Sequence, residues 1–158
     1  MSDVLTLELD EITNLVAISG NLVTAGQPSE AQMRGLAVQG FKVIINLGLN
    51  DPRYCLRDEA GLVESLSMEY RHFPVDFALP TSEDLSRFFD ALKECEGKKV
   101  FVHCAANFRV SSFISLYAQT HFNWSLEEAE KFIRDIWEPD AVWEKFIQNS
   151  RRRLGLSL

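Results

Sequence analysis

The chain has 158 residues, of which 46% are hydrophobic and 25% charged, as expected for one soluble globular domain. Its net charge of −7 argues against general binding to nucleic acid or an anionic membrane, because both require a basic surface. Three cysteines are too few for a disulfide framework, and no close His/Cys cluster predicts a metal site. The acidic N-terminal residues contain no export signal, so we expect a cytoplasmic protein.

Short apolar runs alternate with helical patterns along the chain. Strands are predicted at residues 22–26, 41–47, 69–75 and 99–103. Helices are predicted after Ser29 and at residues 59–67, 81–94, 110–120, 126–137 and 141–152. Ser29 is a predicted N-cap, Thr81 to Asp84 form the signal that opens the helix at 81–94, and Ser125 with Glu128 forms a predicted capping box. This alternation predicts an α/β fold with a largely parallel central sheet flanked by helices, and a C-terminal helical bundle on one face. We expect a single domain over residues 1–158, with an N-terminal extension at 1–21 and a core at 22–150.

The stretch that carries chemistry joins a strand, a tight loop and a helix N-terminus at Cys104 and Arg109. Loop N–H groups, the helix dipole and a guanidinium can together bind an oxyanion. The same positive field favours the thiolate of Cys104, which is the nucleophilic form. A cation is unfavourable in the first turn of a helix, and a bound anion would account for Arg109.

Several neighbours of Cys104 have predicted roles in this anion site. Asn107 is expected at positive φ, which Asn tolerates better than other non-glycine residues. A hydroxyl of Ser111 or Ser112 could donate to the cysteine sulfur. His103 should point away from the pocket and support the loop backbone, because side chains alternate along a strand. The loop residues expected to hold the anion are Ala105, Ala106, Asn107, Phe108 and Arg109.

Asp76 follows the strand predicted at 69–75. Ligands bind at the carboxyl ends of parallel strands, so the Asp76 and Cys104 loops should open to the same side of the sheet. A carboxylic acid there could protonate the leaving oxygen of a substrate. Arg53 and Arg57 lie in the loop after the strand predicted at 41–47. We expect them to be free on the surface; the alternative is that they help to select the substrate.

Together these motifs resemble the small cysteine-dependent phosphatases, most closely bacterial dual-specificity-like members of the protein tyrosine phosphatase superfamily. The resemblance covers residues 22–147 and is carried by His103-Cys104, Arg109-x-Ser-Ser, Pro74-Val-Asp76, Pro80, Thr24-Ala-Gly-Gln-Pro28 and Val43-Ile-Ile-Asn-Leu47. It implies two steps without metal or cofactor, in which Cys104 becomes a phosphocysteine, Arg109 and the loop amides hold the phosphoryl oxygens, and Asp76 protonates the leaving oxygen and then activates water. The implied partners are a phosphorylated protein or small-molecule phosphate, and inorganic phosphate or another oxyanion, but no nucleic acid and no membrane.

The loop departs from the family pattern in its length. Four residues separate Cys104 from Arg109, whereas the family has five, so the cradle has one N–H fewer. Rhodanese-type sulfurtransferases share a Cys-x4-Arg loop whose cysteine carries a persulfide. The chain lacks their His-Ile-Pro-Gly-Ala-like segment, and Asp76 would have no role there. A phosphate-binding module with weak turnover is a third alternative.

The remaining features are expected to be structural. Core packing is predicted for Trp124, Trp137 and Trp143. Arg151 to Arg153 are expected to form a solvated tail. Cys55 and Cys95 are expected to be inert.

Overall fold

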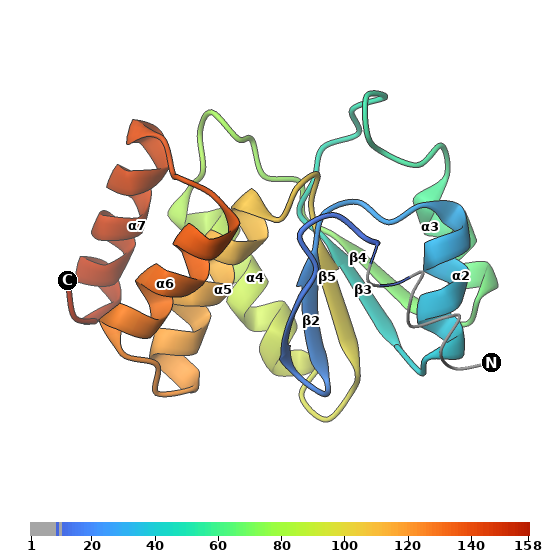
Figure 1. Cartoon of the computed structure of the whole chain (residues 1–158), viewed down its shortest axis with the longest axis horizontal. Helices are drawn as coiled ribbons and strands as arrows, with labels where there is room; N and C mark the ends of the chain where they lie inside the picture. Colours follow the sequence, from blue (N-terminus) through green and yellow to red (C-terminus); the bar gives the residue numbers. More distant parts are fainter. Residues whose placement is uncertain (1–8, 10) are drawn as a thin grey trace.

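A five-stranded sheet forms the centre of the protein, which we describe from a computed structural model of residue 9 and residues 11–158 (Figure 1). The strands are β1 Val16–Ser19, β2 Leu22–Ala25, β3 Val43–Asn46, β4 Glu69–His72 and β5 Val100–His103. Their order in the sheet is β1-β2-β5-β3-β4. Only β1 and β2 pair antiparallel, and the three other neighbouring pairs are parallel. The predicted α/β fold with a largely parallel sheet is confirmed.

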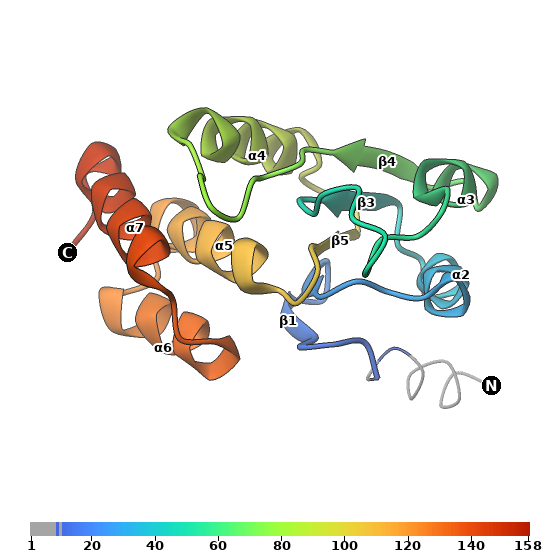
Figure 2. The same ribbon diagram turned by 90° about the horizontal axis from the view of Figure 1, so that it is seen from above.

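Helices cover both faces of this sheet. They are α2 Glu30–Val38, α3 Glu59–Ser65, α4 Ser82–Glu94, α5 Phe108–His121, α6 Leu126–Ile136 and α7 Ala141–Leu154. Helices α2 and α3 pack on one face, while α4 to α7 gather on the other (Figure 2). The predicted C-terminal bundle is therefore present, with α4 as an additional member.

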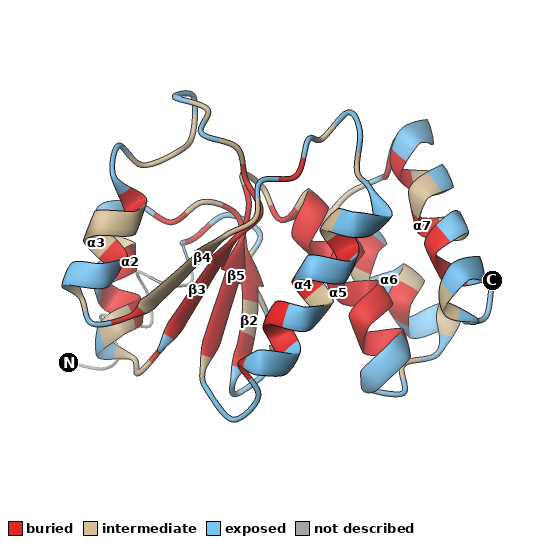
Figure 3. Ribbon diagram, turned by 180° about the vertical axis from the view of Figure 1, so that it is seen from behind, coloured by how far each residue is buried: buried red, intermediate tan, exposed pale blue. Residues whose placement is uncertain are grey.

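The interior strands β3 and β5 are buried along their whole length (Figure 3). Their side chains alternate between the two faces: Ile44 and Phe101 pack with α2 and α3, whereas Ile45 and Val102 pack against the bundle. Both faces need apolar cover, which explains the continuous apolar runs in the sequence. Both strands end at the same edge of the sheet, and that edge carries the site described below.

Helix starts follow the predicted capping signals. Capping boxes begin α2 at Ser29, α4 at Thr81 and α6 at Ser125. Helix α5 begins at Phe108, two residues earlier than predicted. The earlier start draws the last loop residue into the helix and keeps Arg109 in the first turn.

The C-terminal arginines differ from the prediction. Arg151 is fully buried, so its assignment to a solvated tail was wrong, whereas Arg152 and Arg153 are exposed. Helix α7 extends past Arg151, and this residue shares a buried face with Trp143 and Ile147 at helical spacing. Because three arginines are consecutive in the sequence, the pattern did not indicate that Arg151 faces the bundle.

The predicted core packing is confirmed for Trp143 and for Trp137, which packs against the core, whereas Trp124 lies in neither described core cluster. Trp143 is fully buried, and Trp124 and Trp137 are partly buried. Trp124 packs edge-on against Phe132, and Trp137 stacks on Phe108 with 4.6 Å between ring centroids. The second contact links the bundle to the loop after Cys104.

The expected N-terminal extension contributes to the fold in its described part. It supplies β1 and the buried side chain of Ile12, while residues 1–8 and 10 lie outside the described residues. Within the described ranges, no helix combines the length and apolar character needed to cross a membrane.

Candidate active site

Cys104 lies in the loop between β5 and α5, at the carboxyl edge of the parallel sheet. Its side chain is buried and lines a cavity of about 340 Å³. Ala105, Ala106, Phe108 and Arg109 line the same cavity, together with Leu49, Asp51, Arg53, Tyr54 and Phe77 from other segments. The structure thus brings Cys104 and Arg109 to one cavity.

Two carbonyl groups of the loop between Cys104 and Arg109 accept hydrogen bonds from other segments. Ala105 O accepts from Gln27 N at 3.0 Å, and Ala106 O accepts from Asn14 Nδ2 at 2.9 Å. These contacts, with a bridge between Gly26 and Ala106, hold the loop against the end of β2 and against Asn14.

Asn107 adopts the left-handed conformation that was predicted, with φ of 69°. Its side chain is buried and donates from Nδ2 to Asn14 O at 2.8 Å and to Thr24 Oγ1 at 3.1 Å. Asn107 thus shapes the loop through its backbone and fastens it to the residues around β1 and β2 through its side chain.

Two glycines allow other segments to approach this loop closely. A Cβ at Gly26 would lie 2.5 Å from Ala105 O, well inside contact distance. A Cβ at Gly48 would lie 3.2 Å from Tyr54 Cε2 and 3.6 Å from the Cα of Cys104. Close packing of the β2 and β3 ends therefore fixes where the loop sits.

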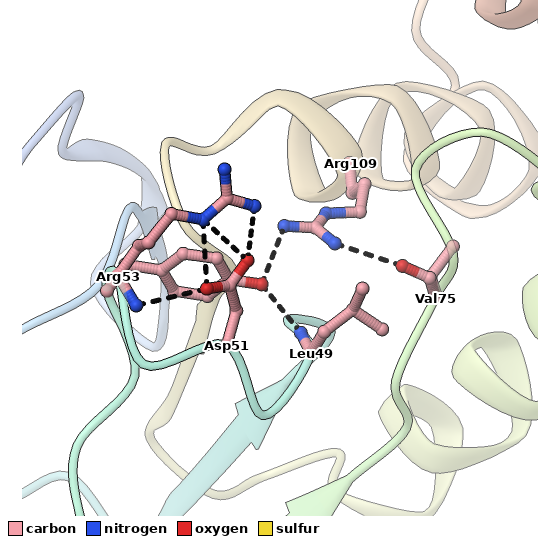
Figure 4. A network of polar contacts seen from close by, with 6 residues as sticks. Leu49, Asp51, Arg53, Val75 and Arg109 are labelled. Carbon is pink, nitrogen blue, oxygen red and sulfur yellow. Dashed lines mark hydrogen bonds and ion pairs between the residues drawn. The ribbon is translucent and has the colours of Figure 1, made fainter.

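Arg109 is buried, with 5% of its surface exposed, and lines the cavity. Its Nη1 donates to Val75 O at 3.0 Å and its Nη2 to Tyr54 Oη at 3.4 Å (Figure 4). Its Cζ lies 5.8 Å from the Phe77 ring centroid. Its Nε has no hydrogen-bond partner in the described part of the chain. Nη1 is anchored, so the edge formed by Nε and Nη2 remains the fork that could hold an oxyanion.

Asp51 also lines the cavity, and the sequence analysis missed it. Its carboxylate accepts from Arg53 Nη2 at 2.6 Å and from Arg53 Nε at 3.0 Å (Figure 4). Hydrogen bonds from the Arg53 side chain and from the Arg53 backbone N–H, with lesser effects of the Arg53 and Arg109 charges, lower the pKa of Asp51 to about 2 against the opposing effect of desolvation. Asp51 is therefore ionised at neutral pH and cannot serve as a proton donor in this arrangement.

Asp76 follows β4 at the predicted edge, and its side chain is exposed. Its Oδ1 accepts from Ala78 N at 2.9 Å. Both neighbours of Asp76 touch Arg109, Val75 through its carbonyl and Phe77 through its ring. The loop is tied to the bundle by Trp143 Nε1, which donates to Phe77 O at 2.8 Å. The Asp76 and Cys104 loops thus open to the same side of the sheet, while the Asp76 carboxylate is turned into its own loop.

His103 points away from the cavity, as strand alternation predicted, and meets the buried Glu59. Its Nε2 lies 2.7 Å from Glu59 Oε2, and its Nδ1 lies 3.2 Å from Cys104 O. Burial raises the pKa of Glu59, but hydrogen bonds from His103 and Gln27 and the His103 charge outweigh it and hold that pKa below its usual value.

The two serines of the first helical turn do not contact the sulfur. Both hydroxyls, of Ser111 and Ser112, donate to Phe108 O at 3.0 Å. The expected hydrogen bond to Cys104 is therefore absent among these contacts, and the serines hold the start of α5 instead.

The loop between β3 and α3, whose arginines were expected to be free on the surface, supplies residues to the cavity of Cys104. Arg53 lines the cavity that contains Cys104, while Arg57 lines a separate one. Tyr54, for which the sequence predicted no role, contacts Arg109 directly. The signal was present in the sequence, because this loop follows the carboxyl end of an interior parallel strand, where ligands bind.

A buried cysteine, an arginine at the start of the following helix and an Asp loop at the same sheet edge define the class of cysteine-dependent phosphatases. A family model described as a DSP-PTPase phosphatase fused to NAD+ kinase matches residues 10–145. The chain belongs to this family of dual-specificity-type protein tyrosine phosphatases. The family match favours the phosphatase interpretation over the rhodanese-type alternative.

The chain is also similar to individual proteins of known sequence or structure. A DUF442 protein of Shewanella putrefaciens CN-32, assigned as a phosphatase, is 30% identical, with a TM-score of 0.84 over 94% of this chain and 97% of that one. The core catalytic domain of the PP-IP phosphatase SIW14 of S. cerevisiae, in complex with citrate, is 16% identical with a TM-score of 0.73 over 91% and 92% of the two chains, which shows a shared fold. A beta-lactamase hydrolase-like protein of Agrobacterium fabrum (strain C58 / ATCC 33970) is 34% identical over 97 residues, 60% of this chain. The chain spans 22% of that protein's length.

Proposed function

We propose that the protein hydrolyses phosphate monoesters through a phosphocysteine at Cys104. The observation that carries the proposal is the guanidinium of Arg109, which is buried beside Cys104 with only neutral hydrogen-bond partners and an unpartnered Nε. A buried cation without a carboxylate partner is costly, and a bound dianion would offset that cost. The loop N–H groups and the α5 dipole add to the same positive field.

The chemistry divides into two displacements. In the first, the Cys104 thiolate attacks phosphorus, the bond from phosphorus to the ester oxygen breaks, and the leaving oxygen takes a proton from Asp76. In the second, a water attacks phosphorus, the S–P bond breaks, and Asp76 takes a proton from that water. Arg109 and the loop N–H groups stabilise the phosphoryl oxygens in both steps.

Asp76 is the better candidate for the acid despite its exposed side chain. Asp51 lies in the cavity, but its pairing with Arg53 keeps it ionised. Asp76 lies between two residues that contact Arg109, and we propose that its side chain rotates off Ala78 N and reaches the cavity when substrate binds. Asp76→Asn should therefore lower kcat most for substrates with poor leaving groups, and least for aryl phosphates with good ones.

The substrates proposed are phosphorylated small molecules or phosphorylated proteins. The cavity is small and bounded by the rings of Phe77 and Phe108, so it suits one phosphoryl group with an apolar or aromatic neighbour. The citrate complex of the yeast relative supports an oxyanion as the ligand of this site.

Hydrolysis of p-nitrophenyl phosphate with and without EDTA tests the proposal. We expect turnover that is insensitive to the chelator and is abolished in Cys104→Ser, because serine is far less nucleophilic than a thiolate. Rapid quench with a 32P-labelled substrate should trap a phosphocysteine in Asp76→Asn. Activity that survives Cys104→Ser, or that requires a metal, would contradict the mechanism. Phosphate binding without turnover would instead identify a binding module.

A further inference from the structure

Tyr54 brings a hydroxyl group into the catalytic cavity from the loop that follows β3. This loop lies 55 positions from Arg109 in the sequence, yet Tyr54 Oη is 3.4 Å from Arg109 Nη2. The same oxygen accepts from Leu49 N at 2.8 Å, which holds the hydroxyl in place. The ring can approach because Gly48, next to Leu49 in the chain, has no side chain.

The hydrogen bonds of the Tyr54 hydroxyl leave its donor hydrogen unused. A tyrosine hydroxyl has one donor hydrogen and can accept from two groups. Leu49 N–H and the Arg109 guanidinium are both donors, so both contacts use oxygen lone pairs. No described residue accepts the hydroxyl hydrogen of Tyr54. Its donor is therefore available to a ligand in the cavity.

The need for such a donor follows from the length of the loop. With four residues between Cys104 and Arg109, the cradle offers one backbone N–H fewer than the five-residue loop of the resembling phosphatases. A donor beside the Nε and Nη2 edge of Arg109 would lie next to an oxyanion held there. An O–H bond to a charged oxygen is one of the stronger hydrogen bonds available to a protein.

We propose that Tyr54 contacts the substrate by donating its hydroxyl hydrogen to a phosphoryl oxygen held by Arg109. Tyr54 thereby supplies a donor from outside the shortened loop. This inference rests on the proposed function, because it assumes that a phosphoryl group occupies the cavity. The hydroxyl remains fixed by Leu49 N when the ligand binds, so little ordering accompanies the new hydrogen bond.

The test compares Tyr54→Phe with Tyr117→Phe, a matched removal of a tyrosine hydroxyl in α5 outside the catalytic cavity. The probe is inorganic phosphate, measured as its Kd by calorimetry and as a competitive inhibitor of p-nitrophenyl phosphate hydrolysis. A hydrogen bond to a charged group contributes about 1.5–3 kcal/mol, so Tyr54→Phe should weaken phosphate binding by about ten- to a hundredfold. It should also lower kcat/KM, while Tyr117→Phe should change neither quantity.

The outcomes separate this inference from the function on which it rests. If the wild type neither binds phosphate nor hydrolyses the ester, the proposed function fails. If the wild type does both and Tyr54→Phe matches it, only the role of Tyr54 is overturned. A Tyr54→Phe variant with a lower melting temperature but wild-type phosphate affinity would also overturn it, since the hydroxyl would then serve only to hold Leu49.

Discussion

Two arginines are buried among the described residues, and of these two only Arg151 has a carboxylate within ion-pair distance. Arg151 donates to Glu130 Oε1 at 2.7 Å and to Gln119 Oε1 at 3.1 Å. Arg109 donates only to a backbone carbonyl and a phenol oxygen, and no described residue forms an ion pair with it. Glu130 neutralises the charge of Arg151 directly, whereas the nearest anion of Arg109 is Asp51, which is itself hydrogen-bonded to Arg53. Burial alone thus does not distinguish a structural arginine from a binding one, but the charge of its partners does.

Arg109→Met should produce the largest effect, and it should be an effect on activity. The substitution keeps the aliphatic volume but removes the fork, and loss of one positioned stabiliser of this kind lowers kcat by about 10²–10³-fold. The free energy of unfolding should change by less than about 1 kcal/mol, because the buried cation had no carboxylate partner to lose. Steady-state kinetics and urea titration measure the two quantities. A large loss of stability with normal kcat would reverse the roles assigned to the two arginines.

Arg151→Met should show the opposite pattern. It removes the hydrogen bonds to Glu130 and Gln119, and hydrogen bonds to charged groups contribute about 1.5–3 kcal/mol. Glu130 is one-third exposed and also lies 3.4 Å from Arg134, so the cost should fall near the lower end, about 1–2 kcal/mol. We expect kcat/KM within twofold of the wild type. Unchanged stability together with impaired hydrolysis would contradict a purely structural role.

The shift in melting temperature caused by inorganic phosphate also distinguishes the two arginines. A ligand of the folded state at ten times its Kd stabilises by about 1.4 kcal/mol, which corresponds to about 3–5 °C in a domain of this size. The shift should appear in the wild type and in Arg151→Met and should vanish in Arg109→Met. An equal shift in Arg109→Met would place the phosphate elsewhere.

The pair of Glu59 and His103 is an intermediate case, in which a buried charge has a titratable partner. The pKa of Glu59 is lower in the folded protein than in the unfolded chain, so its contribution is present above the ordinary glutamate pKa and is lost as the pH falls through the lower folded value. Glu59→Gln should therefore be less stable than the wild type at pH 6, and the difference should shrink below about pH 4. Urea titrations across this range measure it. A difference that grows on acidification would contradict the pairing.

Local patterns predicted those parts of the site that local chemistry determines. The strand–loop–helix around Cys104, the left-handed Asn107 and the outward His103 each follow from residues within a few positions of one another. The caps at Ser29, Thr81 and Ser125 do so as well.

Contacts between distant segments were not predictable in the same way. Tyr54 meets Arg109 from 55 positions away, Glu59 meets His103 from 44, and Arg151 meets Gln119 from 32. Each depends on which strands become neighbours and on the rotation of a helix about its axis. Periodicity alone does not give either of these for a short polar segment.

A crystal structure with bound tungstate tests the central claim most directly. The account predicts an oxyanion in the cavity of Cys104, within hydrogen-bond distance of Nε and Nη2 of Arg109, of the loop N–H groups and of Tyr54 Oη. Tungstate bound elsewhere, with Arg109 Nε still unpartnered beside Cys104, would contradict it.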